Sequence, residues 1–269
     1  MKNDECLDRY GATALVTGAS SGIGEQFAIL LAAKGFDLLI TARREDKLAS
    51  LKERLEKEHK VTVSYFACDL CEPVEVEALI ERAQSMNIGL VVSNAGYGVS
   101  KGEFLSIEQD ALSAMYQANS LAPARIARAL LPSMVQAKRG GFIFTGSMEG
   151  DAVFPLSAAY AASKAFLHSL VMALWYEVKS SGVDVLLLAP GSTDTNAPIS
   201  QGISRDQLVG VMSPAAVAEQ ALAHLGKQPH FTPGFHNRFF VALLRLLPKK
   251  MAIALAGGGM KQAMQKSAA

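Results

Sequence analysis

Tyr160 and Lys164 place a phenol and an ammonium four residues apart, a spacing that puts both side chains on one face of a helix. A tyrosine in water has a pKa of about 10, which is too high for proton exchange near neutral pH. We expect the charge of Lys164 to favour the phenolate, so that Tyr160 can trade a proton with a substrate oxygen. Ser147 follows an apolar segment, where its hydroxyl could hold that oxygen. Each residue also has an ordinary interpretation, as a surface pair or a loop hydroxyl, but together they indicate acid–base catalysis.

A glycine-rich segment near the start of the chain predicts a phosphate-binding turn. Residues 17–24 read T-G-A-S-S-G-I-G, after the apolar segment 12–17 and before segment 25–34, whose apolar residues recur at helical spacing. Between a strand and a helix, such a turn receives a dinucleotide pyrophosphate on its backbone N–H groups and the helix dipole. Its spacing, G-x-x-x-G-x-G, differs from the more frequent G-x-G-x-x-G. The residues expected to form this cradle are Gly18, Ser20, Ser21, Gly22, Ile23 and Gly24.

Two arginines after the second predicted strand bear on the choice of cofactor. An NAD-binding chain usually ends this strand with an acid that binds the ribose 2′-hydroxyl. Here residues 37–41 are followed by Ala42, Arg43 and Arg44, with no acid at the tip. Guanidinium groups suit a 2′-phosphate, although both arginines could instead be solvated charges at the start of a helix. The sequence therefore favours NADP(H) over NAD(H).

The order of the segments predicts a single α/β domain, residues 1–269, with a doubly wound parallel sheet of the Rossmann type. Short apolar strands alternate with helix-length segments from residue 12 to about 190, without a linker rich in Pro or Ser. Right-handed crossovers then place helices on both faces of the sheet. The predicted strands are 12–17, 37–41, 61–67, 89–93, 141–145 and 183–189, and the predicted helices are 25–34, 44–59, 73–86, 107–118, 121–138 and 158–180.

In their order and spacing, the motifs of residues 12 to about 195 resemble those of the short-chain dehydrogenase/reductase family. They are T-G-x-x-x-G-x-G at 17–24, Asp69-Leu70, Asn94-Ala95-Gly96, Asn119, Ser147, Tyr160-x-x-x-Lys164 and Pro190-Gly191. Ser93 replaces a frequent asparagine of the family, which leaves the catalytic set intact. Residues 42–44 and 93–98 are similar to the branch that contains 3-ketoacyl-CoA reductases and hydroxysteroid dehydrogenases.

The resemblance implies a role for each matching residue. Ser147, Tyr160 and Lys164 would be catalytic, and Asn119 would support a proton-relay water. Asp69 would contact the adenine side, and Lys164 would also bind the nicotinamide ribose. Thr195 would touch the carboxamide. Beyond the glycine turn and the two arginines, the implied cofactor contacts are Asp69, Leu70, Asn94, Ala95, Gly96, Tyr160, Lys164, Pro190, Gly191, Thr193 and Thr195.

Composition excludes several other classes of protein. Half of the 269 residues are hydrophobic and 19% are charged, so disorder is not expected. A net charge of +1 without a basic run argues against a nucleic-acid partner. Residues 1–11 have no apolar stretch typical of a secretory signal, and an odd cysteine count fits a reducing cytoplasm. Cys68 and Cys71 form C-x-x-C, but no second pair completes a metal site, so no metal is expected.

Three features leave alternatives open. The polar segment 192–212 is expected to be a mobile substrate lid. The apolar segment 235–259 is too interrupted by basic residues to span a membrane. It could be a helix pair that forms a homodimer or homotetramer, a pocket wall or an interfacial helix. Glu149 is an unusual acid close to Ser147. The residues expected to line an apolar pocket are Tyr97, Val99, Phe154, Leu156 and Met212.

Two functions are compatible with these patterns. The first is an NADP(H)-dependent oxidoreductase that acts on a small-molecule carbonyl or secondary alcohol, with Tyr160 as the general acid or base. The second is a non-catalytic NADP(H)-binding sensor on the same scaffold. The complete set of Ser147, Tyr160, Lys164 and Asn119 favours the enzyme, because a sensor has no need of it.

Overall fold

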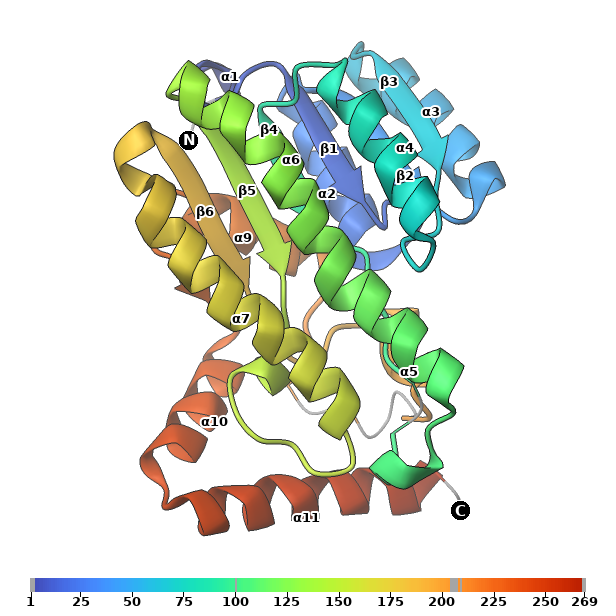
Figure 1. Ribbon diagram of the computed structural model, residues 1–269, viewed down its shortest axis with the longest axis vertical. Coiled ribbons are helices and arrows are strands. Elements are labelled where there is room, and N and C mark those ends of the chain that lie inside the picture. The colour runs from blue at the N-terminus through green and yellow to red at the C-terminus, as the bar shows by residue number, and fades with distance from the viewer. Residues whose placement is uncertain (1–2, 100, 204–207, 209, 268–269) are drawn as a thin grey trace.

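A seven-stranded parallel sheet forms the centre of the computed structural model, which describes residues 3–99, 101–203, 208 and 210–267 (Figure 1). The strand order within these residues is β3-β2-β1-β4-β5-β6-β7. Because both faces of a parallel sheet are covered, most residues of the central strands are apolar and buried, whereas the edge strand β3 is mostly half-buried. The strands are β1 (Thr13–Thr17), β2 (Asp37–Ala42), β3 (Val63–Ala67), β4 (Leu90–Ser93), β5 (Gly140–Thr145), β6 (Val183–Leu188) and β7 (His230–Phe231).

The direction of winding reverses between β1 and β4, which pair side by side although β2 and β3 separate them in the chain. At such a switch point the loops that follow the two strands diverge and leave a crevice at their carboxyl ends. The sheet confirms the predicted doubly wound fold. Strand β7 was not predicted, because two residues are too few to show a period.

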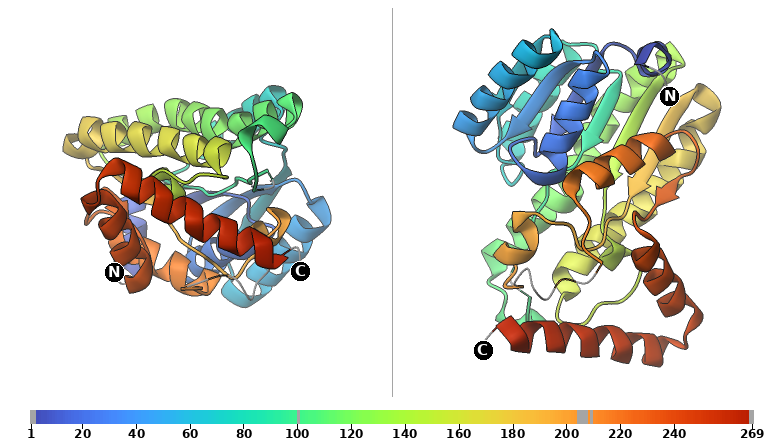
Figure 2. Two further views of the ribbon diagram at one scale, coloured as in Figure 1. Left: turned by 90° about the horizontal axis from the view of Figure 1, so that it is seen from below. Right: turned by 180° about the vertical axis from the view of Figure 1, so that it is seen from behind.

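Helices cover both faces of the sheet (Figures 1 and 2). One core joins the sheet to α2, α3 and α9, and the other joins it to α4, α6 and α7. The helix α5 precedes a five-residue π-helical stretch, η2 (Gln117–Leu121), which leads into α6. The ranges are α2 (Gly22–Ala33), α3 (Glu45–His59), α4 (Pro73–Gln84), α5 (Gln109–Tyr116), α6 (Ala122–Ala137), α7 (Ala158–Val178) and α9 (Pro214–His224).

A short N-terminal helix, α1 (Asn3–Tyr10), was not predicted. Tyr10 is almost fully buried against the sheet, and its hydroxyl donates a hydrogen bond to Asp184 of β6 at 2.9 Å. Arg9 donates to the same carboxylate at 2.6 Å. The helix is polar overall and too short for a periodic signal, so these tertiary contacts hold it in place.

The C-terminal segment forms two helices beyond the carboxyl edge of the sheet, α10 (Phe235–Leu246) and α11 (Lys249–Ser267) (Figure 2). The turn between them contains Pro248, which cannot extend α10. Val241 and Leu244 are buried, but Phe239 is 62% and Leu246 84% exposed. None of the helices among the described residues is long and apolar enough to cross a membrane.

Candidate active site

The loops at the carboxyl ends of strands β1 to β6 surround a cavity of about 1010 Å³. This volume lies at the upper end of the range for small-molecule and cofactor sites. Because parallel strands all end at the same edge, residues far apart in the chain come together here. Every predicted catalytic or cofactor residue lines the cavity except Gly24 and Asn119, which lie directly behind the lining.

The glycine turn after β1 needs its glycines for two physical reasons. Gly18 has a φ of +70°, and a Cβ there would lie 2.9 Å from the Cα of Ala95. At Gly24 a Cβ would collide with the carbonyl of Gly18, so α2 could not pack on the turn. The turn therefore exposes backbone N–H groups at the start of α2, an arrangement that fits a pyrophosphate.

Arg44 lies across this turn. Its guanidinium nitrogen Nη2 donates to the Ser20 carbonyl at 3.2 Å and to the Ser20 and Ser21 hydroxyls at 3.0 Å each. The side chain of Arg43 is 67% exposed, and its ion-pair partner is Asp69 at 3.9 Å. Both arginines line the cavity at its β2 end.

The loop after β4 is tied to the turn after β1. The hydroxyl of Thr17 accepts hydrogen bonds from the backbone N–H groups of Asn94 and Ala95 at 3.0 and 2.9 Å. The amide of Asn94 donates to the Thr17 carbonyl at 3.3 Å. These bonds close the crevice at the switch point and position residues 94–96 beside the glycine turn.

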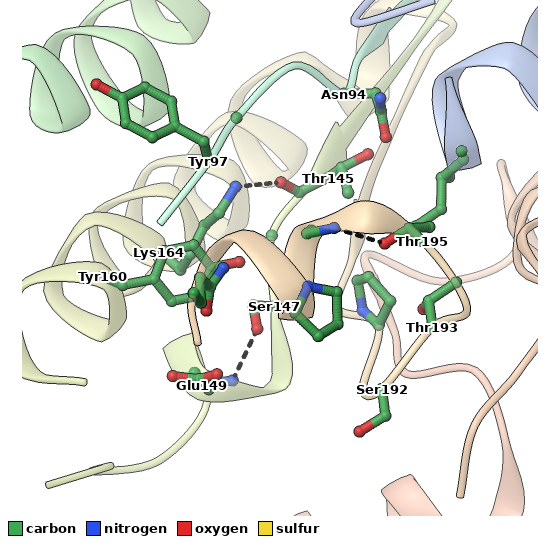
Figure 3. A pocket seen from close by; sticks show the side chains of 18 of the residues that line it. Asn94, Tyr97, Thr145, Ser147, Glu149, Tyr160, Lys164, Ser192, Thr193 and Thr195 are labelled. Atoms are coloured by element: carbon green, nitrogen blue, oxygen red, sulfur yellow. Dashed lines mark hydrogen bonds between the residues drawn. The ribbon is translucent and has the colours of Figure 1, made fainter. Parts of the chain in front are cut away.

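Ser147, Tyr160 and Lys164 meet where β5 ends (Figure 3). The ammonium of Lys164 lies 5.8 Å from the centre of the Tyr160 ring and donates to the Thr145 carbonyl at 3.0 Å. Ser147 contacts Tyr160 through a side-chain hydrogen bond, and its hydroxyl also accepts from the backbone N–H of Glu149 at 3.1 Å. The hydroxyl of Thr145 is buried and has no hydrogen-bond partner among the described residues, which is consistent with a polar ligand here.

The protonation of Tyr160 differs from the expectation. Burial raises its pKa well above the ordinary value, the Glu149 carboxylate raises it further, and the hydrogen bond to Ser147 lowers it. Burial also lowers the pKa of Lys164, to about 8. The prediction that Lys164 lowers the pKa of Tyr160 is therefore wrong for these side chains by themselves, because desolvation disfavours both charged forms. Near neutral pH Tyr160 is a phenol.

Asn119 is fully buried in the π-helical stretch η2. Its amide exchanges two hydrogen bonds with the backbone of Tyr97, accepting from the N–H at 3.0 Å and donating to the carbonyl at 2.7 Å. It also donates to the hydroxyl of Ser163 at 3.1 Å. Irregular turns of this kind are frequent at functional sites. The structure thus gives Asn119 a positioning role next to Lys164, and the implied relay water stays a prediction.

The segment after β6 leaves the sheet and returns to the same point. Thr193 pairs with Met212 in an isolated parallel bridge, so residues 192–212 form a loop with adjacent ends. The methyl group of Thr195 would lie 3.0 Å from a Cβ on Gly22, which places Thr195 beside the glycine turn. Residues 204–207 and 209 of the expected lid lie outside the described residues.

The far wall of the cavity is apolar and comes mainly from the C-terminal helices. Tyr97 and Phe154, predicted as pocket residues, contribute to it, whereas Val99, Leu156 and Met212 do not. The contribution of α10 and α11 agrees with the pocket-wall alternative. The residues of these helices that line the wall are His236, Asn237, Phe239, Phe240, Ala256, Gly259, Met260 and Ala263.

Sequence reasoning missed a histidine–carboxylate cluster behind the site. The carboxylate of Asp151 is fully buried and contacts His168 of α7 at 2.6 Å, His230 of β7 at 3.0 Å and Arg245 of α10 at 3.3 Å. The two histidines lower the pKa of Asp151 to about 2 despite its burial. The composition resembles a metal site, but Arg245 already brings a positive charge to the same carboxylate oxygen as His168. We interpret the cluster as an anchor that holds α10 to the site.

Cys68 and Cys71 do not have the environment of reactive thiols. Burial raises the pKa of both, that of Cys68 to about 12, so neither is a stabilised thiolate. The sulfur of Cys71 lies 3.6 Å from the hydroxyl of Tyr97.

Comparison with known proteins shows similarity to short-chain dehydrogenases. A family model described as short chain dehydrogenase matches residues 12–206. The 7beta-hydroxysteroid dehydrogenase of Clostridium sardiniense is 29% identical over 232 residues, which cover 86% of this chain and 88% of that protein. The very-long-chain 3-oxoacyl-CoA reductase of Coprinopsis cinerea is 35% identical over 180 residues, or 66% of this chain. The match spans only 53% of that reductase, about half of its length.

A solved structure shares both the fold and part of the sequence. A short-chain dehydrogenase from Sphingobium yanoikuyae, in complex with NADPH, has a TM-score of 0.79 and 30% identity to this chain. The superposition covers 88% of this chain and 96% of the other.

Proposed function

The chain belongs to the short-chain dehydrogenase family, and we propose that it transfers a hydride between NADP(H) and a carbonyl or secondary alcohol, with Tyr160 as the general acid or base. The observation that carries the proposal is the convergence of Ser147, Tyr160 and Lys164 on one cavity with the glycine turn. The glycine cradle and the unpartnered hydroxyl of Thr145 fit a dinucleotide. When bound, the nicotinamide ring supplies or accepts the hydride.

Ser147 and Tyr160 divide the work on the substrate oxygen. In the reduction direction the hydroxyl of Ser147 donates a hydrogen bond to the carbonyl oxygen, and Tyr160 donates the proton. The raised pKa of Tyr160 keeps it protonated near neutral pH and therefore suits this direction. In the oxidation direction Tyr160 must first lose its proton, so that rate rises with pH.

A preference for NADP(H) rests on the two arginines. Arg44 is fixed by its bonds to Ser20 and Ser21, and Arg43 lies next to it at the rim, so both guanidinium groups can reach a 2′-phosphate at this end of the cavity. The NADPH complex of the Sphingobium relative supports the same choice.

The substrate is proposed to be a ketone or alcohol with a bulky apolar body. The wall opposite the cofactor end contains Phe154, Phe240 and Met260, while Ala256 and Gly259 leave room. Burial of an apolar body against this wall contributes about 25 cal/mol per Å². The relatives named for hydroxysteroid and very-long-chain 3-oxoacyl-CoA substrates support a large ligand. Residues 192–212 are proposed to close over it.

The test is NADPH oxidation with a panel of bulky ketones, ketoacyl thioesters, diketones and small aldehydes. We expect turnover with bulky ketones or thioesters, and a loss of turnover in Tyr160→Phe with NADPH binding retained. Tight NADPH binding without turnover on any compound would instead favour the sensor.

A further inference from the structure

Lys101 is a buried lysine that the mechanism above does not use. It lies in the loop after β4, and only 2% of its side chain is exposed. Its ammonium sits over the face of the Tyr160 ring, 4.7 Å from the ring centre, which is closer than that of Lys164. A cation in this position is attracted to the aromatic face. Lys101 is therefore in direct contact with the proposed proton donor.

Glu149 neutralises this cation. Its carboxylate oxygens lie 3.0 and 2.8 Å from the Lys101 ammonium, and both groups also contact the hydroxyl of Ser157. Glu149 follows Ser147 by two residues and lines the same cavity (Figure 3). Glu149 thus lies next to Ser147, and Lys101 lies against the ring of Tyr160.

The backbone around Lys101 joins three loops. Its N–H donates to the Gln201 carbonyl in the loop after β6, at 3.0 Å. The next residue, Gly102, donates to the carbonyl of Leu156 in the loop before α7, at 2.9 Å. Leu156 has a φ of +64°, a conformation that non-glycine residues rarely adopt and that the surroundings must enforce. The ammonium position is therefore fixed by the fold and does not depend on a flexible surface chain.

We propose that Lys101 and Glu149 are positioning residues for Tyr160: a partly buried ion pair that holds the ring and sets how readily its hydroxyl gives up a proton. The inference rests on the proposed function. The charged groups against the ring, among the residues that the structure describes, are Lys164 on α7, Glu149 after β5 and Lys101 after β4. Gln201 approaches from the loop after β6 without a charge, and α10 adds His236 to the cavity wall.

The two residues of the ion pair have opposite effects on the pKa of Tyr160. The carboxylate of Glu149 raises the pKa of Tyr160, since it opposes a second negative charge nearby. The ammonium of Lys101 compensates for that carboxylate and stabilises the phenolate. Removal of Glu149 should therefore ease ionisation of Tyr160, and removal of Lys101 should hinder it. If the pair only stabilised the fold, removal of Glu149 and removal of Lys101 would not shift the pKa of Tyr160 in opposite directions.

The test is a titration of Tyr160 by NMR in the full chain labelled with carbon-13 at the tyrosine ζ position. The spectrum of Tyr160→Phe identifies the signal among the six tyrosines. The series is wild type, Glu149→Gln, Lys101→Met, Glu149→Gln with Lys101→Met, and Lys101→Arg, each with and without NADP⁺. Arg54→Met, which breaks the remote ion pair with Glu25, is the matched control.

We expect Glu149→Gln to lower the midpoint of Tyr160 by about one to three pH units, the range typical of one charge at this distance. Adding Lys101→Met to that variant should raise the midpoint again. Lys101→Arg and Arg54→Met should leave it at the wild-type value. An unchanged midpoint in Glu149→Gln, or no effect of Lys101→Met in that background, overturns the proposal.

Activity provides an independent comparison. In Lys101→Met the rate of alcohol oxidation at pH 8 should fall about tenfold for each unit by which the Tyr160 midpoint rises, and recover as the pH increases. The rate of ketone reduction near neutral pH should change less. If the NMR midpoints shift as expected but no carbonyl compound is turned over, the ion-pair proposal stands and the proposed function fails. If a carbonyl compound is turned over but the NMR midpoints of Tyr160 do not shift, the proposed function stands and the ion-pair proposal fails.

Discussion

Replacement of Arg44 by Ala should weaken NADPH binding and leave NADH binding nearly unchanged. The guanidinium of Arg44 is oriented by three hydrogen bonds of 3.0 to 3.2 Å to Ser20 and Ser21, so little further ordering is needed when a phosphate binds. NADH lacks the 2′-phosphate and has no comparable contact to lose.

The size of the effect follows from the kind of contact. A hydrogen bond to a charged group contributes about 1.5–3 kcal/mol, which corresponds to roughly 10- to 150-fold in the dissociation constant. Because Arg44 is exposed, solvent screening favours the lower end, about tenfold. Arg43 is 67% exposed and less constrained, so Arg43→Ala should cost less than Arg44→Ala. Arg43→Asp should weaken NADPH further and spare or improve NADH.

The measurement is calorimetric titration of both cofactors at low and at 0.5 M salt. Higher salt should shrink the difference between NADPH and NADH, since it screens charges at an exposed site. Arg54→Ala on α3 serves as the control for loss of a surface arginine. Equal affinities for the two cofactors in the unmodified protein would refute the assignment. An equal loss of NADPH and NADH in Arg44→Ala would show instead that the arginine only supports the turn.

Three further outcomes are expected. Tyr160→Phe should lower turnover by about 10²–10⁴ with NADPH affinity retained, and residual activity above about a tenth of wild type contradicts the acid–base role. Lys164→Met should weaken NADPH binding and yet raise the free energy of unfolding of the cofactor-free protein at pH 7 by up to about 3 kcal/mol, because burial has lowered the lysine pKa from 10.5 to about 8. Between about pH 8 and 10.5 the unfolded wild-type chain binds more protons at Lys164 than the folded chain does, so the free energy of unfolding should rise with pH in that window. The Lys164→Met variant lacks this titrating group and should lack this rise. Thermal unfolding measured across the pH range tests the difference. Truncation at Gly234 removes one wall of the cavity and Arg245, the partner of Asp151 on α10. The truncated protein should therefore aggregate or change its mass as measured by light scattering. A monodisperse, active product would make the segment an accessory tail.

The sequence by itself was sufficient for the fold and for the residues that meet at the candidate active site. Strand burial on both faces leaves a continuous apolar run, and helices leave a period, so β1 to β6 and their helices could be recognised from local pattern. Glycine turns and the Tyr160–Lys164 spacing are equally local, because their geometry is fixed within a few residues. Elements held by distant contacts left no such signal. Examples are α1, which is held by Asp184, and the two-residue strand β7.

The tertiary structure alone decided the environment of Tyr160. The pKa of Tyr160 depends on burial and on the Glu149 carboxylate. The sequence placed Glu149 near Ser147 and Lys164 one helical turn from Tyr160, but it could not show the burial of the ring or the distance of either charge from it. Lys101 lies 59 residues before Tyr160, in a loop without a recognisable motif, yet its ammonium is the closer cation. Asp151 meets His168, His230 and Arg245 for the same reason. Electrostatic interactions act through space, so spacing along the chain predicts them only when both partners share one helix.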